Sequence, residues 1–210
     1  MTQPPTDASA CFIDRYNSKD TYFFKSGNPN LVVQRKYSPP WSWEGSSNYD
    51  NTSSKLPGLG KKEGVDLGTL VDVFVWKTLP RFVFRSASGY EVRAAKEDTW
   101  ADNSGSIGEE VSLTCFSKVH GITAVTEVGN QILIVTGSQY SFAEGPDKAA
   151  GDKQDLGSAA SAALPVLGNP SKEGPHVYLL HGSAWTPYAV VAGGEDGDGN
   201  VTGSALKKTA

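Results

Sequence analysis

The chain has 210 residues, of which 38% are hydrophobic, and its formal net charge at neutral pH is −4. This length suits one β-rich domain with a core of its own. The negative charge provides no basic field to attract nucleic acid, so we expect no nucleic-acid partner. The 23 glycines and 12 prolines favour short strands and turns over long helices.

Cys11 and Cys115 are the only cysteines, and their wide separation fits neither a disulfide framework nor a metal knuckle. The N-terminus lacks the basic segment and apolar run of a secretory signal. No apolar run approaches the roughly 18 residues that a spanning helix needs. We therefore expect synthesis in a cytoplasm and no membrane partner.

Residues 1–30 are polar with isolated aromatic residues, which predicts an extended N-terminal arm lying on its own domain or on a neighbouring subunit. A single β-rich domain is predicted over 31–206, and 207–210 are predicted to form a frayed C-terminal tail. Residues 41–64 are rich in Ser, Asn, Gly and Pro, which predicts a long loop. Loops of this length are uncommon in compact domains and are often functional.

Four aromatic residues lie in or beside this predicted loop: Tyr37, Trp41, Trp43 and Tyr49. Exposed aromatic rings can stack on sugars or anchor a protein interface, because they bury a large area at a low entropy cost. The alternative is that the rings pack the loop onto its own core. We treat the four residues as candidate contacts for a protein partner or a glycan.

Alternating apolar residues predict strands from residue 71 onward. In the run 81–85, Phe82 and Phe84 are expected on one face of a hairpin, with Val83 on the other. Further on, 111–115 and 122–128 alternate in the same way. The pair Gly129-Asn130 then predicts a two-residue turn that pairs Val128 with Gln131.

The small-residue run 158–164 predicts at most one or two helical turns, because alanine favours helix but the run is short. The segment 176–192 predicts another hairpin around a Gly182-Ser183 turn. Overall the pattern predicts an all-β fold, either an antiparallel β-sandwich or a barrel-like meander with long loops.

Three nine-residue segments share an order of apolar strand, turn and aromatic residue: FVFRSASGY, ILIVTGSQY and VYLLHGSAW. They begin at residues 82, 132 and 177, a spacing close to the repeat length of propeller blades. Repeated hairpins of a propeller are therefore the alternative fold, although three or four blades are few to close a ring.

The run 194–202 contains Asp196, Asp198 and Asn200, an alternation of oxygen-bearing side chains that is similar to calcium loops of EF-hands and dockerins. Gly194 and Ala205 stand where such loops carry acidic ligands. A polar hairpin tip built on Asp-Gly and Gly-Asn turns explains the same residues.

No catalytic motif occurs, and His120, His176 and His181 lack the spacing of metal ligands. We therefore predict no catalytic residues and no cofactor.

Residues 121–142, GITAVTEVGNQILIVTGSQYSF, resemble hairpins in tail and head-to-tail proteins of tailed bacteriophages. The acidic, cysteine-poor and β-rich chain with an aromatic arm also looks like a decoration, neck, tail or fibre component of such particles. The resemblance implies a non-enzymatic structural protein, placed in the virion and assembled with other virion proteins or with copies of itself as a homo-oligomer. A carbohydrate-binding β-domain that uses the loop aromatics is the alternative function.

Overall fold

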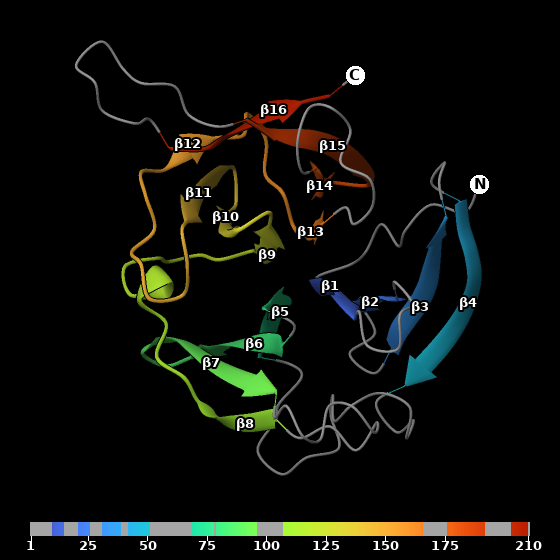
Figure 1. Ribbon diagram of the computed structural model, residues 1–210, viewed down its shortest axis with the longest axis horizontal. Helices are drawn as coiled ribbons and strands as arrows, with labels where there is room; N and C mark the ends of the chain where they lie inside the picture. The colour runs from blue at the N-terminus through green and yellow to red at the C-terminus, as the bar shows by residue number, and fades with distance from the viewer. Residues whose placement is uncertain are drawn as a thin grey trace. The chain divides into compact units, whose positions relative to one another are not determined.

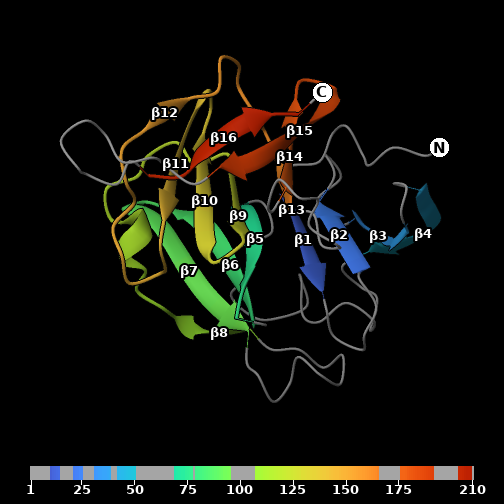
Figure 2. The ribbon, with the colours of Figure 1, turned by 45° about the horizontal axis from the view of Figure 1, so that its top comes forward.

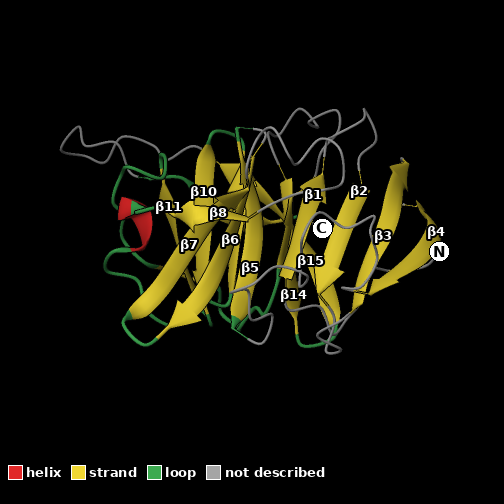
Figure 3. Ribbon diagram, turned by 90° about the horizontal axis from the view of Figure 1, so that it is seen from below, coloured by secondary structure: helices red, strands yellow, loops and turns green. Residues whose placement is uncertain are grey.

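The computed structural model describes residues 10–14, 21–25, 31–38, 42–50, 69–77, 79–95, 107–165, 176–191 and 203–209. Within these ranges the protein consists of β-strands, turns and one 3₁₀ turn at Thr114–Phe116, with no α-helix (Figure 3). The all-β class expected from the sequence is confirmed.

Across the described residues the strands form four sheets of four strands each, named A to D in chain order. Sheet A contains β1 (Ala10–Asp14), β2 (Thr21–Lys25), β3 (Leu31–Ser38) and β4 (Ser42–Asp50). Sheet B contains β5 (Leu70–Trp76), β6 (Leu79–Ser86), β7 (Gly89–Ala95) and β8 (Ile107–Glu110). Sheet C contains β9 (Ala124–Val128), β10 (Gln131–Thr136), β11 (Gln139–Ala143) and β12 (Gln154–Asp155). Sheet D contains β13 (Ala163–Pro165), β14 (His176–His181), β15 (Ala184–Val191) and β16 (Ala205–Lys208).

Each sheet is an antiparallel meander in which every strand pairs with its neighbour in sequence (Figure 1). None of the sheets closes into a barrel. Propeller blades consist of successive four-stranded meanders. A sandwich consists of sheets that pack face to face. The strand order is thus compatible with the expected sandwich and with the repeated-hairpin alternative.

The chain divides into two compact units, Met1–Ser112 with sheets A and B, and Leu113–Ala210 with sheets C and D. This division falls at residue 112 rather than at the boundary expected at residue 30. Within the first unit β1 lies beside β5, and within the second β9 lies beside β13. In each unit, therefore, the first strands of the two sheets are neighbours.

The three repeated segments form the central hairpins of sheets B, C and D, as the sequence predicted. Each turn occupies the same two positions of the segment, residues 87–88, 137–138 and 182–183. The predicted pairing of Val128 with Gln131 is also confirmed.

Glycine is the first central residue in three of the two-residue turns. Gly129, Gly137 and Gly182 have φ angles of 64°, 67° and 60°. A turn of type II′ requires a positive φ at this position, and glycine adopts it without a clash of the Cβ atom. The turn chemistry thus fixes the register of the flanking strands.

Strands β5 and β6 of sheet B are buried on both faces. Val73 and Phe74 are adjacent on β5, so their side chains point to opposite faces, yet each is 1% exposed. Phe82 and Phe84 alternate with Val83 on β6 as predicted, and all three are buried. A strand that is covered on both faces carries consecutive apolar residues. This burial explains why Phe82, Val83 and Phe84 of β6 are all apolar.

The core of the second unit lies between sheets C and D. Leu133 and Val135 on β10 belong to the same apolar cluster as Val177 and Leu179 on β14. Ile132 and Ile134, which alternate with Leu133 and Val135, are also fully buried. The cluster comprises Ala124, Val128, Leu133, Val135, Tyr140, Phe142, Ala160, Ala163, Val177, Leu179 and Tyr188.

Two predicted non-strand segments in the first unit contain strands. Residues 10–14 and 21–25, inside the predicted arm, pair as β1 and β2, with Phe12 opposite Phe23. Residues 42–50, inside the predicted loop 41–64, form β4 against β3. Aromatic residues favour strands, and polar residues are tolerated at a sheet edge. The polar composition of these two segments therefore did not exclude strands.

The strand expected over 111–115 is wrong. Hydrogen bonds from the backbone N–H groups of Phe116 and Ser117 to the carbonyls of Leu113 and Thr114 close a 3₁₀ turn instead. The Cys115 N–H donates to the Pro146 carbonyl at 3.1 Å. Local turn bonds therefore override the alternating pattern.

Residues 158–164 form no helical turn, which lies within the limit of one or two turns that we expected, because this run uses its backbone groups for bonds to the β10–β11 turn and to β14. The N–H of Ala160 donates to the Gly137 carbonyl at 2.9 Å, and that of Ser161 donates to the Leu180 carbonyl at 2.9 Å. A short alanine run has too little helix stability to compete with such partners.

The predicted tail at 207–210 begins inside a strand, since β16 runs through Lys208. Lys208 pairs with Tyr188, and the N–H of Thr209 donates to the Pro187 carbonyl at 3.1 Å. Pairing with β15 holds this part of the chain in place.

Candidate functional site

The candidate aromatic positions lie along the hairpin of β3 and β4. The register places Tyr37 directly opposite Trp43, whereas Tyr49 lies opposite Val32. Tyr49 follows Trp43 by six positions, a distance of roughly 20 Å along a strand. Trp41 lies outside the described residues. The structure therefore brings Tyr37 and Trp43 together and leaves Tyr49 near the other end of β4.

Sheet A ends at β4, which is its outermost strand. An outermost strand presents a row of backbone N–H and C=O groups that can pair with another chain. Trp43 is therefore located on an edge strand, with Tyr37 on the strand beside it, and not on the long loop that we expected.

The candidate calcium ligands Asp196, Asp198 and Asn200 lie outside the described residues, so the structure does not test them. Across the part of the chain that the structure describes, no group of three or more His, Cys, Asp or Glu side chains could hold a metal ion.

His181 stands at the centre of a polar network that the sequence did not reveal. Its Nδ1 atom lies 3.0 Å from the Ser158 hydroxyl and 3.0 Å from the Ala159 carbonyl oxygen. Its Nε2 atom lies 3.0 Å from the Tyr188 hydroxyl. Ser158 is 23 positions away in sequence, and no local pattern connects it to the histidine.

The neighbours of His181 determine its tautomer. A carbonyl oxygen only accepts hydrogen bonds, so the Nδ1 atom beside the Ala159 carbonyl carries the proton. The Nε2 atom of the neutral ring then accepts a hydrogen bond from the Tyr188 hydroxyl. With Nδ1 protonated, the ring cannot remove a proton from Ser158 through that atom. The Ser158 and His181 side chains are therefore in contact without forming an activated nucleophile.

A second polar group joins sheets C and D. The Tyr140 hydroxyl on β11 donates to Gln154 Oε1 at 2.8 Å and accepts from the Leu206 N–H at 2.9 Å. Gln154 Nε2 donates to the Ser204 carbonyl at 2.9 Å. β16 thus lies beside β11 and is held by side chains of sheet C (Figure 2).

Burial, and secondarily the charge on Tyr140, raises the pKa of Tyr188.

Cys115 is 1% exposed, and burial raises the pKa of its thiol to about 12. A buried thiol with such a pKa stays protonated at neutral pH and is a poor nucleophile. Cys115 is therefore a small residue of the core.

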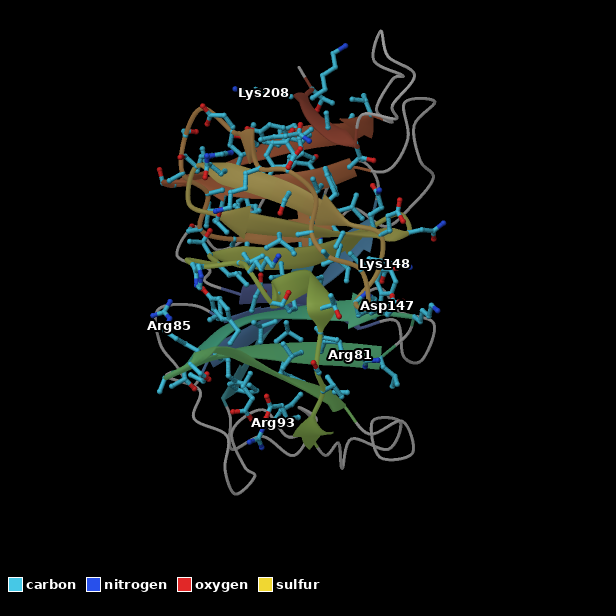
Figure 4. All side chains as sticks on the ribbon, turned by 90° about the vertical axis from the view of Figure 1, so that its left-hand side faces the viewer. Arg81, Arg85, Arg93, Asp147, Lys148 and Lys208 are labelled. Atoms are coloured by element: carbon cyan, nitrogen blue, oxygen red, sulfur yellow. The ribbon has the colours of Figure 1, made fainter. Side chains whose placement is uncertain are left out.

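The arginines of sheet B are dispersed. Arg81 and Arg85 lie toward opposite ends of β6 (Figure 4). Arg81 is half-buried, and its burial lowers the pKa of the guanidinium group. Arg93 pairs with Glu91 on β7. Proteins usually contact phosphate backbones with several basic side chains on one face. Arg81, Arg85 and Arg93 do not form such a face.

In the described ranges, no helix is long and apolar enough to cross a membrane. Comparison with known proteins found no family model and no curated protein that matches this chain.

Proposed function

We propose that this chain is a non-enzymatic structural component of a virus particle and that it assembles through protein–protein contacts. The observation that carries the proposal is β4, a nine-residue strand at the outer edge of sheet A. Strands of this length are efficient templates for pairing with another chain when they are left at an edge. Its aromatic positions are of the kind that anchor protein interfaces.

The polar networks support a structural role. The Ala159 carbonyl and the Tyr188 hydroxyl fix the tautomer of His181, and the Tyr140 hydroxyl ties sheet C to the backbone of β16. Each network is explained by what it holds together within the second unit. The phage resemblance of residues 121–142 supplies the kind of assembly, a symmetric particle built from repeated subunits.

Mass spectrometry of purified particles tests the placement in a virion. We expect the chain to be present in particles produced by the virus or prophage that encodes it, at a stoichiometry set by particle symmetry. Its absence from particles that contain their other structural proteins would overturn the proposal.

The second candidate is a carbohydrate-binding function, which the opposition of Tyr37 and Trp43 favours. Adjacent aromatic residues on a sheet can present a platform for a sugar ring. A glycan array with the native chain and with Trp41→Ala and Trp43→Ala tests this candidate. Binding that both substitutions abolish supports it, and an array without binding removes it.

A further inference from the structure

The two basic residues of β3, Arg35 and Lys36, are adjacent and therefore lie on opposite faces of sheet A. The register places Lys36 directly opposite Glu44 of β4. Opposite charges that face each other across a strand pair stabilise it, so Lys36 has a compensating charge on its own face.

Arg35 has no acidic position among its cross-strand neighbours in sheet A. Tyr22 of β2 stands opposite Arg35. On the other side, the register of β3 with β4 shifts by one residue, so that Gly45 and Ser46 both stand opposite Arg35. On this face the nearest acidic position of the sheet is Asp50, about 13 Å away along the strands. The charge of Arg35 is therefore not matched by a neighbouring strand.

The shift beside Arg35 is an irregularity of the kind that a β-bulge produces. A bulge places two residues of one strand opposite one residue of the other, and bulges are over-represented beside active sites, where they redirect a side chain. Because position 45 is glycine, one of the two positions opposite Arg35 has no side chain. The β4 side of Arg35 thus carries only small residues.

Three aromatic positions share this face with Arg35. Tyr22 lies opposite on β2, Tyr37 lies two residues further along β3, and Trp43 stands opposite Tyr37 on β4. Positions that are two residues apart on a strand, or diagonal across a strand pair, are about 7–8 Å apart, which is within reach of aromatic and long side chains. The topology therefore gathers one arginine and three aromatic residues on one face of β2, β3 and β4.

Sheet A lies beside sheet B through β1, the strand at the opposite end of sheet A from β4 (Figure 1). Tyr37 and Trp43 are located on the two strands farthest from this contact.

A sugar acid combines the two chemical groups that such a set of residues recognises. The planar guanidinium group of arginine matches a carboxylate with two parallel hydrogen bonds. Aromatic rings present large apolar faces that can stack on a sugar ring. An acidic peptide offers the carboxylate without a ring to cover the aromatic positions, so a carboxylated sugar fits the set of residues better.

We infer that this face of sheet A binds a glycan through a sugar residue that bears a carboxylate. Arg35 pairs with the carboxylate, and Tyr37 and Trp43 stack on the sugar ring. The inference rests on the carbohydrate-binding candidate and identifies the chemical class of its ligand.

A change in the ligand provides the first test, because it leaves the protein unaltered. The full chain is applied to an array of uronic-acid and sialic-acid oligosaccharides, their carboxyl-reduced counterparts and sulfated glycans. We expect the carboxyl-reduced forms to bind about 10–100-fold more weakly, the usual effect of losing a hydrogen bond to a charged group. Equal binding of both forms, or binding of sulfated glycans alone, would overturn the inference. A polyglutamate peptide that binds as tightly as the sugar acids would also overturn it.

A charge removal at position 35 provides the second test. Arg35→Gln should lower the affinity for a carboxylated oligosaccharide about 10–100-fold and leave the affinity for its carboxyl-reduced form unchanged. Arg35→Lys keeps the charge but loses the planar fork, so its affinity should lie between those of the native chain and Arg35→Gln. Isothermal titration calorimetry measures the affinities, and circular dichroism verifies that each variant is folded.

Lys36→Gln is the matched control, because it removes the same charge from the adjacent position on the opposite face. It should leave both affinities unchanged. An equal loss of affinity in Arg35→Gln and Lys36→Gln would indicate a general effect of charge and would contradict the assigned face.

The inference and the carbohydrate-binding candidate fail in different ways. Binding of neutral glycans that Trp43→Ala abolishes and Arg35→Gln does not change overturns the role of the carboxylate and leaves carbohydrate binding intact. An array on which no glycan binds removes both, and it leaves the proposed role in a virus particle to the mass spectrometry of purified particles.

Discussion

The hydroxyl group of Tyr140 accepts a hydrogen bond from the backbone N–H of Leu206 at 2.9 Å, across 66 positions of sequence. Leu206 belongs to β16, the edge strand of sheet D, and Tyr140 belongs to β11 of sheet C. The bond therefore uses a side chain of one sheet to satisfy a backbone group at the edge of another. Within the second unit, this contact anchors the last strand of the chain.

Removal of this hydroxyl should loosen β16. We expect Tyr140→Phe to lower the free energy of unfolding by about 1–3 kcal/mol, because the Leu206 N–H loses its acceptor in a partly buried site. Amide hydrogen exchange at Leu206 should accelerate. Tyr188→Phe is the matched control, since it removes a buried tyrosine hydroxyl that contacts His181 instead. Unchanged exchange at Leu206 in Tyr140→Phe would show that the bond contributes nothing.

Tyr188 should make stability depend on pH in the alkaline range. Its pKa is raised by burial and then by the charge on Tyr140. The folded chain therefore holds this proton at pH values where the unfolded chain, with a tyrosine pKa near 10, has lost it. The stabilisation is fully present below about pH 10 and decreases as the pH rises through the folded pKa. Urea unfolding between pH 8 and 11 should show a shallower loss for Tyr188→Phe than for the native chain, and equal slopes would contradict this.

Gly137→Ala should destabilise the central hairpin of sheet C by about 1 kcal/mol, because an L-residue is strained at a φ of 67°. An added Cβ atom would meet nothing within 4 Å, so the cost comes from the backbone alone. Gly151→Ala is the control: its backbone has no positive φ, and its added Cβ would make an ordinary contact with the Phe142 carbonyl oxygen at 3.5 Å. Thermal unfolding that ranks the two variants equally would rule out this explanation.

Lys77 shows the opposite case, a residue with a side chain at a φ of 48°. Lys77→Gly should raise the free energy of unfolding by about 0.5 kcal/mol, since the relief of backbone strain exceeds the added entropy of the unfolded chain. Ser88→Gly, in the exposed turn between β6 and β7, has no positive φ to relieve and should instead lower stability by a few tenths of a kcal/mol. Chemical denaturation of the two variants measures the difference in sign.

Cys115 should resist alkylation in the folded protein. Its thiol is buried and its pKa is raised to about 12, so little thiolate forms at pH 8. Mass spectrometry after iodoacetamide treatment should find Cys115 modified in urea and unmodified in buffer. Rapid modification of the native chain at this position would contradict the burial.

Local chemistry explains what the sequence could predict. The Gly129-Asn130 turn and the Val128–Gln131 pair follow from residues adjacent in the chain, and these predictions are confirmed. Other features depend on distant partners. Residues 158–164 form no helical turn, because the carbonyl groups of Gly137 and Leu180 accept hydrogen bonds from backbone N–H groups of this run. Both partners are distant in sequence, so no local pattern predicts these bonds.

The candidate site shows the same limit. The aromatic positions were identified by composition, but their opposition as Tyr37 and Trp43 depends on the register of β3 with β4. The polar residues of β4 predicted a loop rather than a strand, since serine, asparagine and glycine are typical of loops. The network around His181 needs Ser158, from a different part of the second unit, and therefore appears only in three dimensions.

The meander order of sheet A has a consequence for biosynthesis. Each of its strands pairs with the strand that precedes it, so pairing requires only short loops to close and can proceed as the chain emerges from the ribosome. β4 ends at Asp50, within the first quarter of the chain. The pairing of all four strands of sheet A can therefore precede the translation of sheets C and D.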